Sequence, residues 1–260
     1  GCDATVSLAR RLHQETEGNP FFLMETIKGL FESGTIHMEK GKWIIDLNEI
    51  DKKNLPLPES LTEAIRGRIR SLGDNDHDLL QLAAVLGREF DFDILKTVWG
   101  RDDDAMLEVL DGLLRQRLIE EGSGPTSRDY VFTHHKIREV VYGEISRQKR
   151  QRLHAKIAMS LENLRTSQID LFAGEIAFHY EQCQSLDQIW REKAIKYLVQ
   201  SGDRARFLSA FQDALNYYQR ALVILRKSEL PEQAAQVLMK MGLAYHMALE
   251  FEKSRRAYDE

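Results

Sequence analysis

The chain has 260 residues, of which 43% are hydrophobic and 30% are charged, and its formal net charge is −5. This length is enough for two or three domains with buried cores, and the composition is typical of a globular protein rich in surface helices. The small negative charge gives no overall attraction to nucleic acid or to anionic lipid. The chain's 2 cysteines are too few for a disulfide framework or a cysteine metal site, and we expect a reducing, cytoplasmic compartment.

The pattern of apolar residues predicts neither a membrane span nor a signal-peptide core. No apolar run approaches the ~20 residues that a membrane-spanning helix needs, so no membrane contact is expected. The first residues, GCDATVSLARRLHQ, have no initiator Met and no signal-peptide core. The sequence begins and ends within helical patterns, and we therefore expect it to be a piece of a longer protein.

Residues 1–58 are predicted to form a helical segment with a small hairpin. Apolar spacing predicts a first helix, and Gly18 suits the cap at its C-terminal end. Pro20 suits the first position of a second helix, because its φ is already fixed and its missing N–H is not needed there. Two short apolar runs at 36–38 and 42–45 then predict the hairpin.

Residues 59–146 have the pattern of a winged-helix-like domain. The LPLP stretch at 55–58 predicts an extended linker before them, since each proline keeps its predecessor out of the α region. A helix is expected at about 60–72. The elements that follow are three helices and then a two-stranded hairpin: helices 76–86, 92–99 and 103–117, and strands 118–121 and 130–132.

A winged helix suggests DNA binding, but the charge of its insertion helix argues against that function. Five acidic residues lie on or beside the helix that would enter the major groove: Asp102, Asp103, Asp104, Glu108 and Asp111. Only Arg115 and Arg117 oppose them, near the far end. Phosphate contacts dominate the affinity of proteins for DNA, and an acidic helix would be repelled. We therefore expect no direct nucleic acid contact and interpret the hairpin as a packing or regulatory module.

Residues 147–260 are predicted to be an α-solenoid of tetratricopeptide-like helix pairs, incomplete at the C-terminus. Gly202 and Tyr218 recur as Gly242 and Tyr258, with small residues where paired helices approach closely and aromatic residues between the pairs. The period of 40 residues exceeds the roughly 34 of a tetratricopeptide repeat. We expect a longer second helix and a loop inserted at residues 228–231 to account for the difference.

A stack of helix pairs offers a binding surface and no chemistry of its own. We expect a protein partner or a small inducer on this surface, the alternative being a spacer or clamp. Basic residues gather where the stack begins: Arg147, Lys149, Arg150, Arg152 and Lys156. We interpret them as a solvated face, with a site for an acidic partner or a phosphate as the alternative.

The sequence contains no recognisable catalytic motif. It has no GxxxxGK[ST] phosphate-binding loop and no HExxH metal motif. His134 and His135 are adjacent, but no Cys or acidic residue stands beside them at ligand spacing, so no metal site is predicted. The remaining histidines are interpreted as surface or satisfied core residues: His13, His37, His77, His154, His179 and His246. We therefore predict no catalytic residues and no enzyme activity in this chain by itself.

Four stretches in a fixed order carry a family resemblance: TEGNPFFLMETIKGL, LPLPESLTEAIRGRIRSL, FTHHKIREVVY and RQRLHAKIAMSLE, followed by the helix pairs. This order resembles the region downstream of the P-loop ATPase core in STAND proteins, the signal transduction ATPases with numerous domains, such as the maltose-activator type of LuxR regulators. The resemblance covers nearly the whole chain. It implies a mainly α fold with a helical lid at 1–58, a winged-helix domain at 59–146 and the solenoid at 147–260.

The resemblance also implies a nucleotide switch. In such proteins an ATPase domain, the lid and the winged helix close around ADP, and inducer binding at the helical repeats favours ATP and opening. Gly18, Asn19 and Pro20 match the family's Gly-x-Pro motif, whose proline packs near the adenine.

A second motif of the family falls at Thr133, His134 and His135. Related switch ATPases carry Met-His-Asp there, and its histidine reaches the β-phosphate of ADP. His134 matches that histidine, while His135 departs from the acidic residue. Arg138, one turn further on, is a second phosphate-facing candidate.

His134 can also be interpreted from the residues alone. A histidine at a helix start lies in a positive field suited to an anion, and burial would make its charge respond to a nearby phosphate. Capping the helix or packing on the hairpin explains the same position. Pro20 is likewise explained by helix initiation alone.

Two functions fit these patterns. The first is a non-catalytic regulatory and sensor part of a STAND-type ATPase, in a signalling or transcription regulator, that couples nucleotide state to partner or inducer binding. ATP or ADP would be held only in the full-length protein, for which ATPase activity and oligomerisation are open, and no cofactor is expected on this chain by itself. The alternative is a plain tetratricopeptide-like interaction scaffold without nucleotide sensing.

Overall fold

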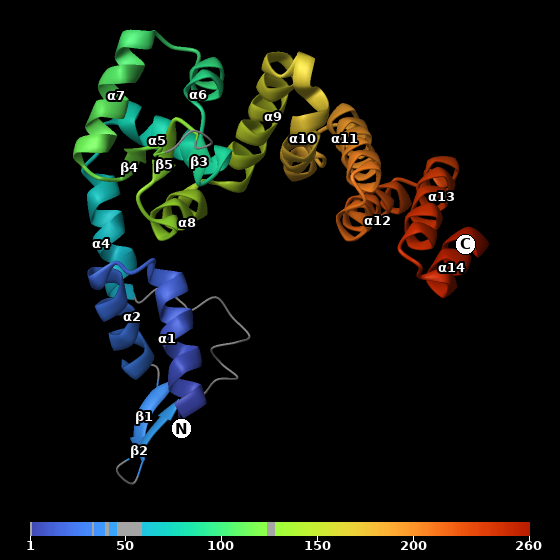
Figure 1. Ribbon diagram of the computed structural model, residues 1–260. Helices are drawn as coiled ribbons and strands as arrows, with labels where there is room; N and C mark the ends of the chain where they lie inside the picture. Colours follow the sequence, from blue (N-terminus) through green and yellow to red (C-terminus); the bar gives the residue numbers. More distant parts are fainter. Residues whose placement is uncertain (1, 33, 40–41, 46–58, 124–127) are drawn as a thin grey trace. The chain divides into compact units, whose positions relative to one another are not determined.

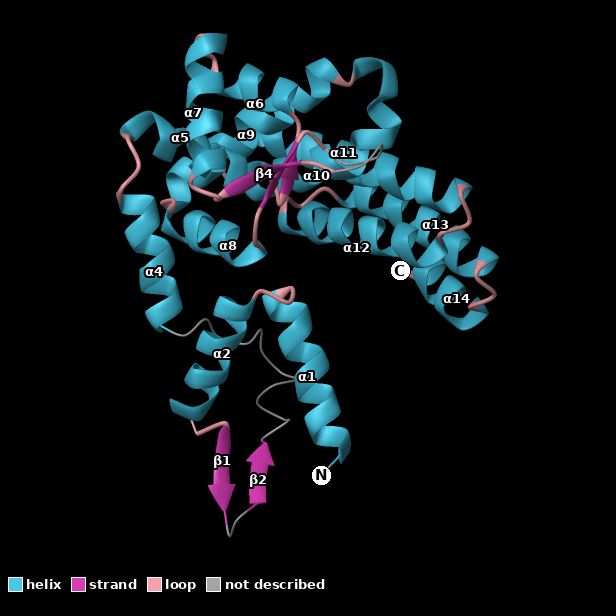
Figure 2. Ribbon diagram, turned by 60° about the vertical axis from the view of Figure 1, so that its left-hand side comes forward, coloured by secondary structure: helices cyan, strands magenta, loops and turns pink. Residues whose placement is uncertain are grey.

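A computed structural model describes residues 2–260 except 33, 40–41, 46–58 and 124–127, and it is mainly helical (Figure 1). The strands are few and short (Figure 2). The chain divides into two compact units, one of residues 1–92 and 101–145 and the other of residues 93–100 and 146–260. The predicted domain boundaries at 58 and 146 stay predictions, and the first lies outside the described residues, as does the predicted linker at 55–58.

The first unit contains every strand that the structure describes. Its elements are α1 (Cys2–Thr16), α2 (Pro20–Glu32), β1 (Ile36–Glu39), β2 (Lys42–Ile45), α4 (Glu59–Arg70), α5 (Asp74–Leu86), β3 (Glu89–Phe90), α7 (Asp103–Arg115), β4 (Ile119–Glu121), β5 (Tyr130–Phe132) and α8 (His135–Glu144). The second unit is helical. Its elements are α6 (Phe92–Trp99), α9 (Arg147–Leu164), the short 3-10 helix η1 (Thr166–Gln168), α10 (Ile169–Cys183), α11 (Gln188–Phe207), α12 (Phe211–Lys227), α13 (Pro231–Met247) and α14 (Phe251–Asp259). Phe92, the first residue of α6, belongs to the first unit.

Helices α1 and α2 and the hairpin form the segment predicted as a lid. A small apolar core joins them, made of Leu8, Leu12, Leu30 and Ile36. The hairpin is antiparallel, with Ile36 opposite Ile45. Both predicted helices and both predicted strands are present, although the hairpin turn at 40–41 lies outside the described residues.

Helix α5 lies at the centre of the part of the chain that is predicted to be winged-helix-like. All eight residues from Leu79 to Leu86 are buried, so this helix is surrounded by its neighbours. The sheet has three antiparallel strands in the order β3-β5-β4. The predicted two-stranded hairpin is therefore incomplete: β3 has only the residues Glu89 and Phe90, too few for a strand pattern to be read from the sequence. The acidic residues in and just before α7 are exposed, as their charge predicts.

The second unit continues as a stack in which α9 to α14 each pack against the next helix in the chain (Figure 1). Three successive turns of the stack share one geometry, with a left-handed residue at Ser209, Glu229 and Leu249. In each turn the next residue's N–H reaches back five residues, as in the 2.9 Å bond from Ala210 to the Ala205 carbonyl. The turn at 228–230 is thus the same length as its neighbours. The predicted loop insertion at 228–231 is wrong, and the longer repeat comes from longer helices.

The predicted packing of small residues against aromatic rings is confirmed in both repeats. A Cβ built on Gly202 would lie 2.4 Å from Cε1 of Tyr218, and one on Gly242 would lie 2.6 Å from Cε1 of Tyr258. Such distances are shorter than any packed carbon pair tolerates. Only glycine therefore lets the paired helices approach this closely.

A half-buried carboxylate ties three successive helices of the stack together. Glu162 of α9 accepts hydrogen bonds from the hydroxyls of Tyr180 and Tyr197 at 2.7 and 2.6 Å and from Lys193. Burial alone would raise the pKa of Glu162, but these three donors lower it below its ordinary value. The carboxylate is therefore held ionised inside the stack.

Among the described residues, no helix combines the length and the apolar character that crossing a bilayer requires.

Replacing Gly202 by alanine tests the repeat packing. We expect Gly202→Ala to lower the free energy of unfolding by about 1–3 kcal/mol, because the new methyl group overpacks the site beside Tyr218. Gly143→Ala is the matched control, since nothing lies within 4 Å of a Cβ at that helical glycine. Urea unfolding followed by circular dichroism measures both. Equal stability of the two variants would contradict the packing described.

Candidate functional site

The turn between α1 and α2 is built from residues with distinct local roles. Glu17 and Gly18 both have left-handed backbones, with φ of 50° and 73°. Asn19 then caps α2, its Oδ1 accepting from the N–H of Phe22 at 3.4 Å, and Pro20 is the first helical residue. The local conformation of the Gly18–Asn19–Pro20 motif is thus explained by helix ending and helix starting.

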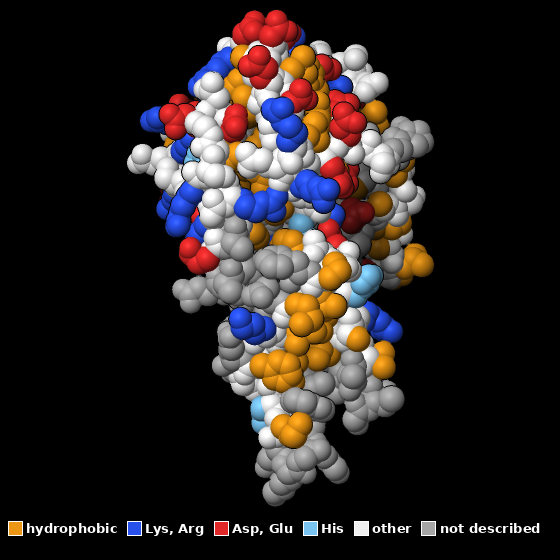
Figure 3. All heavy atoms as spheres, turned by 90° about the vertical axis from the view of Figure 1, so that its left-hand side faces the viewer, with side chains coloured by type: hydrophobic (Ala, Val, Ile, Leu, Met, Phe, Trp, Pro, Cys, Tyr) orange, Lys and Arg blue, Asp and Glu red, His pale blue; other side chains and the backbone are white. Residues whose placement is uncertain are grey.

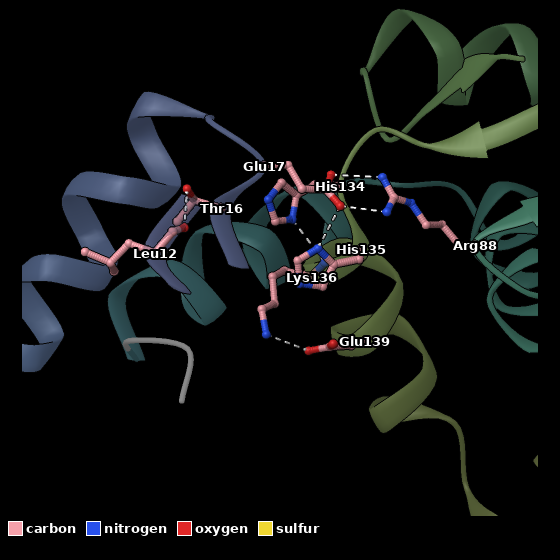
Figure 4. Close-up of polar contacts among 8 residues, drawn as sticks. All are labelled: Leu12, Thr16, Glu17, Arg88, His134, His135, Lys136 and Glu139. Carbon is pink, nitrogen blue, oxygen red and sulfur yellow. Dashed lines mark hydrogen bonds and ion pairs between the residues drawn. The ribbon is translucent and has the colours of Figure 1, made fainter. Parts of the chain in front are cut away.

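His134 caps the start of α8 on the opposite side of this turn. Its Nδ1 accepts a hydrogen bond from the N–H of Lys136 at 3.1 Å, and the residue is only 2% exposed. The ring stacks on Phe22 of α2, with centroids 3.9 Å apart and planes 3° from parallel. The structure therefore brings His134 against the predicted lid, and Figure 4 shows it between Thr16, Glu17 and the start of α8.

The cap decides which protons the ring of His134 can carry. An Nδ1 that accepts from a backbone N–H has no proton of its own, so the neutral ring must be protonated at Nε2. This Nε2 is buried and makes no hydrogen bond to any described residue. An unsatisfied buried donor costs about 1–3 kcal/mol. The Thr16 carbonyl lies close enough to the ring to favour its charged form, but Nε2 makes no hydrogen bond of ordinary geometry to it, so this N–H is incompletely satisfied within the described residues.

Glu17 links the turn to two other parts of the first unit (Figure 4). Its carboxylate forms a two-pronged ion pair with Arg88, with contacts of 2.7 and 3.0 Å. The same carboxylate lies 3.2 Å from Nδ1 of His135, whose ring lies 4.6 Å from that of His134. Glu17, His135 and Arg88 thus form a polar cluster beside the buried ring.

The environment of His134 favours its neutral form. Burial is the largest influence and lowers the pKa of His134 below its ordinary value. The Thr16 carbonyl and Glu17 oppose this shift by favouring the charged ring, and His135 and Lys136 add to it. The lowering prevails, and a neutral ring agrees with the acceptor role of Nδ1.

Glu17, His134 and His135 also lie within metal-ligand range of one another, their ligand atoms being within 4.8 Å. Sequence spacing could not show this, because Glu17 lies far upstream. Two features argue against a metal. A ligating histidine normally donates its second N–H, whereas Nδ1 of His134 accepts one, and the carboxylate of Glu17 is already paired with Arg88. The cluster therefore suits an anionic or carbonyl acceptor better than a cation.

Arg138 is not brought to this cluster. Its Nε donates to the carbonyl of Ala84 at 2.9 Å, and its guanidinium lies over the ring of Tyr142. Burial lowers the pKa of Arg138. Its contacts tie α8 to the C-terminal end of α5, and its role towards a phosphate stays a prediction.

Sequence patterns missed several of the residues that form this site. Glu17 and Phe22 lie in the TEGNPFFLMETIKGL stretch but were given no role at the site, and Arg88 lies in none of the four stretches. The contact between His154 and His179 in the second unit was also not predicted. Both residues are 1% exposed, and their Nδ1 atoms lie 2.8 Å apart. Contacts between residues this far apart in the chain leave no local spacing that could have indicated them.

Comparisons with known proteins return distant likenesses, and no family model matches the chain. A stretch of 125 residues, 47% of this chain, is 24% identical to Hybrid signal transduction histidine kinase G of Dictyostelium discoideum and covers 4% of that protein. A solved STAND protein with a tetratricopeptide repeat sensor, from Pyrococcus horikoshii, aligns over 96% of this chain and 49% of its own, with 15% identity and a TM-score of 0.33. The chain thus spans about half the length of that structure and a small part of the kinase. A TM-score this low does not establish a common fold.

Reversing the charge of Arg88 tests whether Glu17 holds the turn in place. Arg88→Glu places two carboxylates together, and we expect amide exchange in the α1–α2 turn to rise about fivefold, as for the loss of a partly exposed ion pair. The double variant Glu17→Arg with Arg88→Glu should restore much of the protection. Arg115→Glu, at an exposed position of α7, is the control. Exchange rates unaffected by Arg88→Glu would show that the ion pair does not hold the turn.

The pKa of His134 gives a second test. Because the folded state favours the neutral ring, the contact is fully stable above the ordinary pKa of 6.5 and is weakened as the pH falls through the lowered value. We expect a proton NMR titration to give a pKa below 6.5 for the ring signal that disappears in His134→Asn. A value above 6.5 would contradict the buried, neutral assignment.

Proposed function

We propose that this chain is the regulatory and sensor part of a STAND-type signalling ATPase. In this proposal α1 and α2 act as the lid, the part from α4 to α8 acts as a winged helix, and the helix stack acts as a tetratricopeptide-like sensor. ATP or ADP would be held by an ATPase domain of the full-length protein. The match to a signal transduction kinase supports a signalling role, and the family resemblance of the four sequence stretches supports the STAND assignment.

The observation that carries the proposal is the buried Nε2 of His134, which makes no hydrogen bond of ordinary geometry to a described residue. A buried donor that is incompletely satisfied calls for an explanation, and a functional role is one. A phosphate oxygen is a strong acceptor, and its hydrogen bond would be strengthened by the positive end of α8. His134 also touches the predicted lid through Phe22. A change at the nucleotide would therefore be transmitted to the lid through one ring.

Exposed apolar side chains on α2 and β1 support the presence of a further domain packed against the proposed lid. Large apolar side chains are exposed on α2 and β1, including Met24 at 66% and Met38 at 58%. Figure 3 shows hydrophobic side chains running along this part of the molecule. Apolar patches on a protein surface commonly mark interaction sites. In the proposed architecture the ATPase domain would cover this face.

The alternative function, a plain interaction scaffold, has its own observation in the helix stack. Apolar side chains are exposed at the turns of the stack, with Phe207 at 85% and Leu249 at 75%. A partner protein could use this surface whether or not a nucleotide is sensed. The two functions differ in what they expect of His134.

The deciding experiment measures ADP affinity in a longer chain that includes the P-loop domain. His134→Asn keeps an acceptor at the helix cap, because asparagine is a favoured N-cap, but removes the Nε2 donor. Loss of one hydrogen bond to a charged group costs about 1.5–3 kcal/mol, so we expect ADP affinity to fall by about tenfold or more. Isothermal titration calorimetry measures the change.

The same substitution at a remote position provides the control. His246→Asn, on α13, should leave ADP affinity at the wild-type value. Circular dichroism establishes that both variants are folded. If His134→Asn binds ADP as tightly as the wild type, the nucleotide switch is refuted for this chain and the scaffold remains.

A further inference from the structure

A groove crosses three helices of the second unit. It has a volume of about 440 Å³ and is lined by residues of α10, α11 and α12. A second hollow of about 580 Å³ adjoins it, and the two share Asp170 and Arg204. Pockets of a few hundred Å³ are of the size that holds small ligands. The groove lies entirely within the helix stack.

Of the two residues that line both hollows, Arg204 is the one whose charged group has no partner among the described residues. Its side chain is half-buried, and it makes no hydrogen bond or ion pair with any of the described residues around it. Two neighbouring cations of the stack are paired: Arg220 binds Glu181 and Lys240 binds Asp203. An arginine presents a fork of donors that suits a carboxylate. Arg204 is therefore the groove's candidate for an anionic group.

Tyr217 adds a hydroxyl to the same groove. A Cβ on Gly174 would lie 2.7 Å from its Oη, so the absence of a side chain at Gly174 makes room for the phenol between α10 and α12. The hydroxyl makes no hydrogen bond within the described helices, although the ring lies beneath the guanidinium of Arg220. The groove thus holds a second polar group that can bind a ligand.

The rest of the lining combines three carboxylates and apolar side chains with the paired Arg220 and the neutral Ser201 and Asn216. Asp213 is exposed and unpaired among the described residues, and Asp170 accepts only from Gln200. Leu171 and Leu208 are 58% and 61% exposed. Carboxylates on the same groove would repel a purely anionic ligand such as free phosphate and would attract an ammonium group. A ligand must therefore offer both charges and some apolar surface.

We propose that the groove across α10, α11 and α12 binds a short zwitterionic peptide, with the peptide carboxylate at Arg204 and Tyr217 and the ammonium group at Asp213. An apolar side chain of the peptide would cover Leu171 and Leu208. This assignment names a ligand class for the sensor and rests on the proposed function for its link to signalling. Peptide binding itself depends only on the residues of the groove.

Isothermal titration calorimetry of the 260-residue chain with Ala-Leu-Ala tests the proposal. We expect a dissociation constant below about 10 mM. Amidation of the peptide's C-terminus and acetylation of its N-terminus should each weaken binding by about tenfold, since each removes one charged contact. Arg204→Gln should weaken binding of the free peptide to a similar degree. It should have little further effect on binding of the amidated peptide.

Further variants separate the site from general destabilisation. Asp213→Asn should weaken binding of the free peptide and leave binding of the acetylated peptide almost unchanged. Arg152→Gln, at an exposed arginine of α9 outside the groove, is the matched control and should bind as the wild type does. Thermal melts followed by circular dichroism establish that each variant is folded.

The outcomes distinguish this inference from the proposed function. Binding that depends on Arg204 supports the peptide site even if ADP affinity proves independent of His134, because the two measurements use different units of the chain. No binding of Ala-Leu-Ala at about 10 mM, or binding equally strong in Arg204→Gln, overturns the assignment. Binding that is unaffected by capping either end of the peptide overturns the zwitterionic class.

Discussion

One hydrogen bond, from the N–H of Lys136 to Nδ1 of His134, determines the chemistry of the candidate site. By accepting this bond the ring completes the start of α8, and its neutral proton is placed on Nε2. Burial lowers the pKa of His134 and keeps the ring neutral, so the ring is a donor and not a cation. The same arrangement disfavours a metal at the Glu17–His134–His135 cluster. The helix cap therefore leaves Nε2 as the donor of this ring, buried beside helix α2.

The contacts around this donor come from parts of the chain that are far apart in sequence. Phe22 covers one face of the ring, while Glu17 spans from the α1–α2 turn to Arg88 and His135. The ion pair is partly exposed and is expected to contribute little stability. The helix stack is built differently, with glycines packed against tyrosines and the half-buried carboxylate of Glu162 joining successive helices. Its structure is suited to holding a shape and presenting a groove.

Periodicity was sufficient to predict the helices, because each buries one apolar face. The Gly202–Tyr218 spacing predicted close helix packing, which the structure confirms. The predicted loop insertion at 228–231 was wrong, because the roughly six residues by which this repeat exceeds a tetratricopeptide repeat can lengthen the helices as readily as a turn. Strand β3 is too short to leave a pattern. At the site, His134 was indicated by its motif, but Glu17, Phe22 and Arg88 were not, since tertiary contacts over such separations depend on how the elements pack. The groove at Arg204 likewise needs three helices to be in place.

The tautomer of His134 tests the account most directly. A two-bond ¹H–¹⁵N correlation spectrum of the labelled chain at about pH 7.5, above the ordinary histidine pKa, distinguishes the neutral forms from each other and from the charged ring, and His134→Asn assigns the signal. The account predicts a neutral ring with its proton on Nε2. A ring protonated on Nδ1, alone or together with Nε2, would contradict it, because that nitrogen could no longer accept from Lys136.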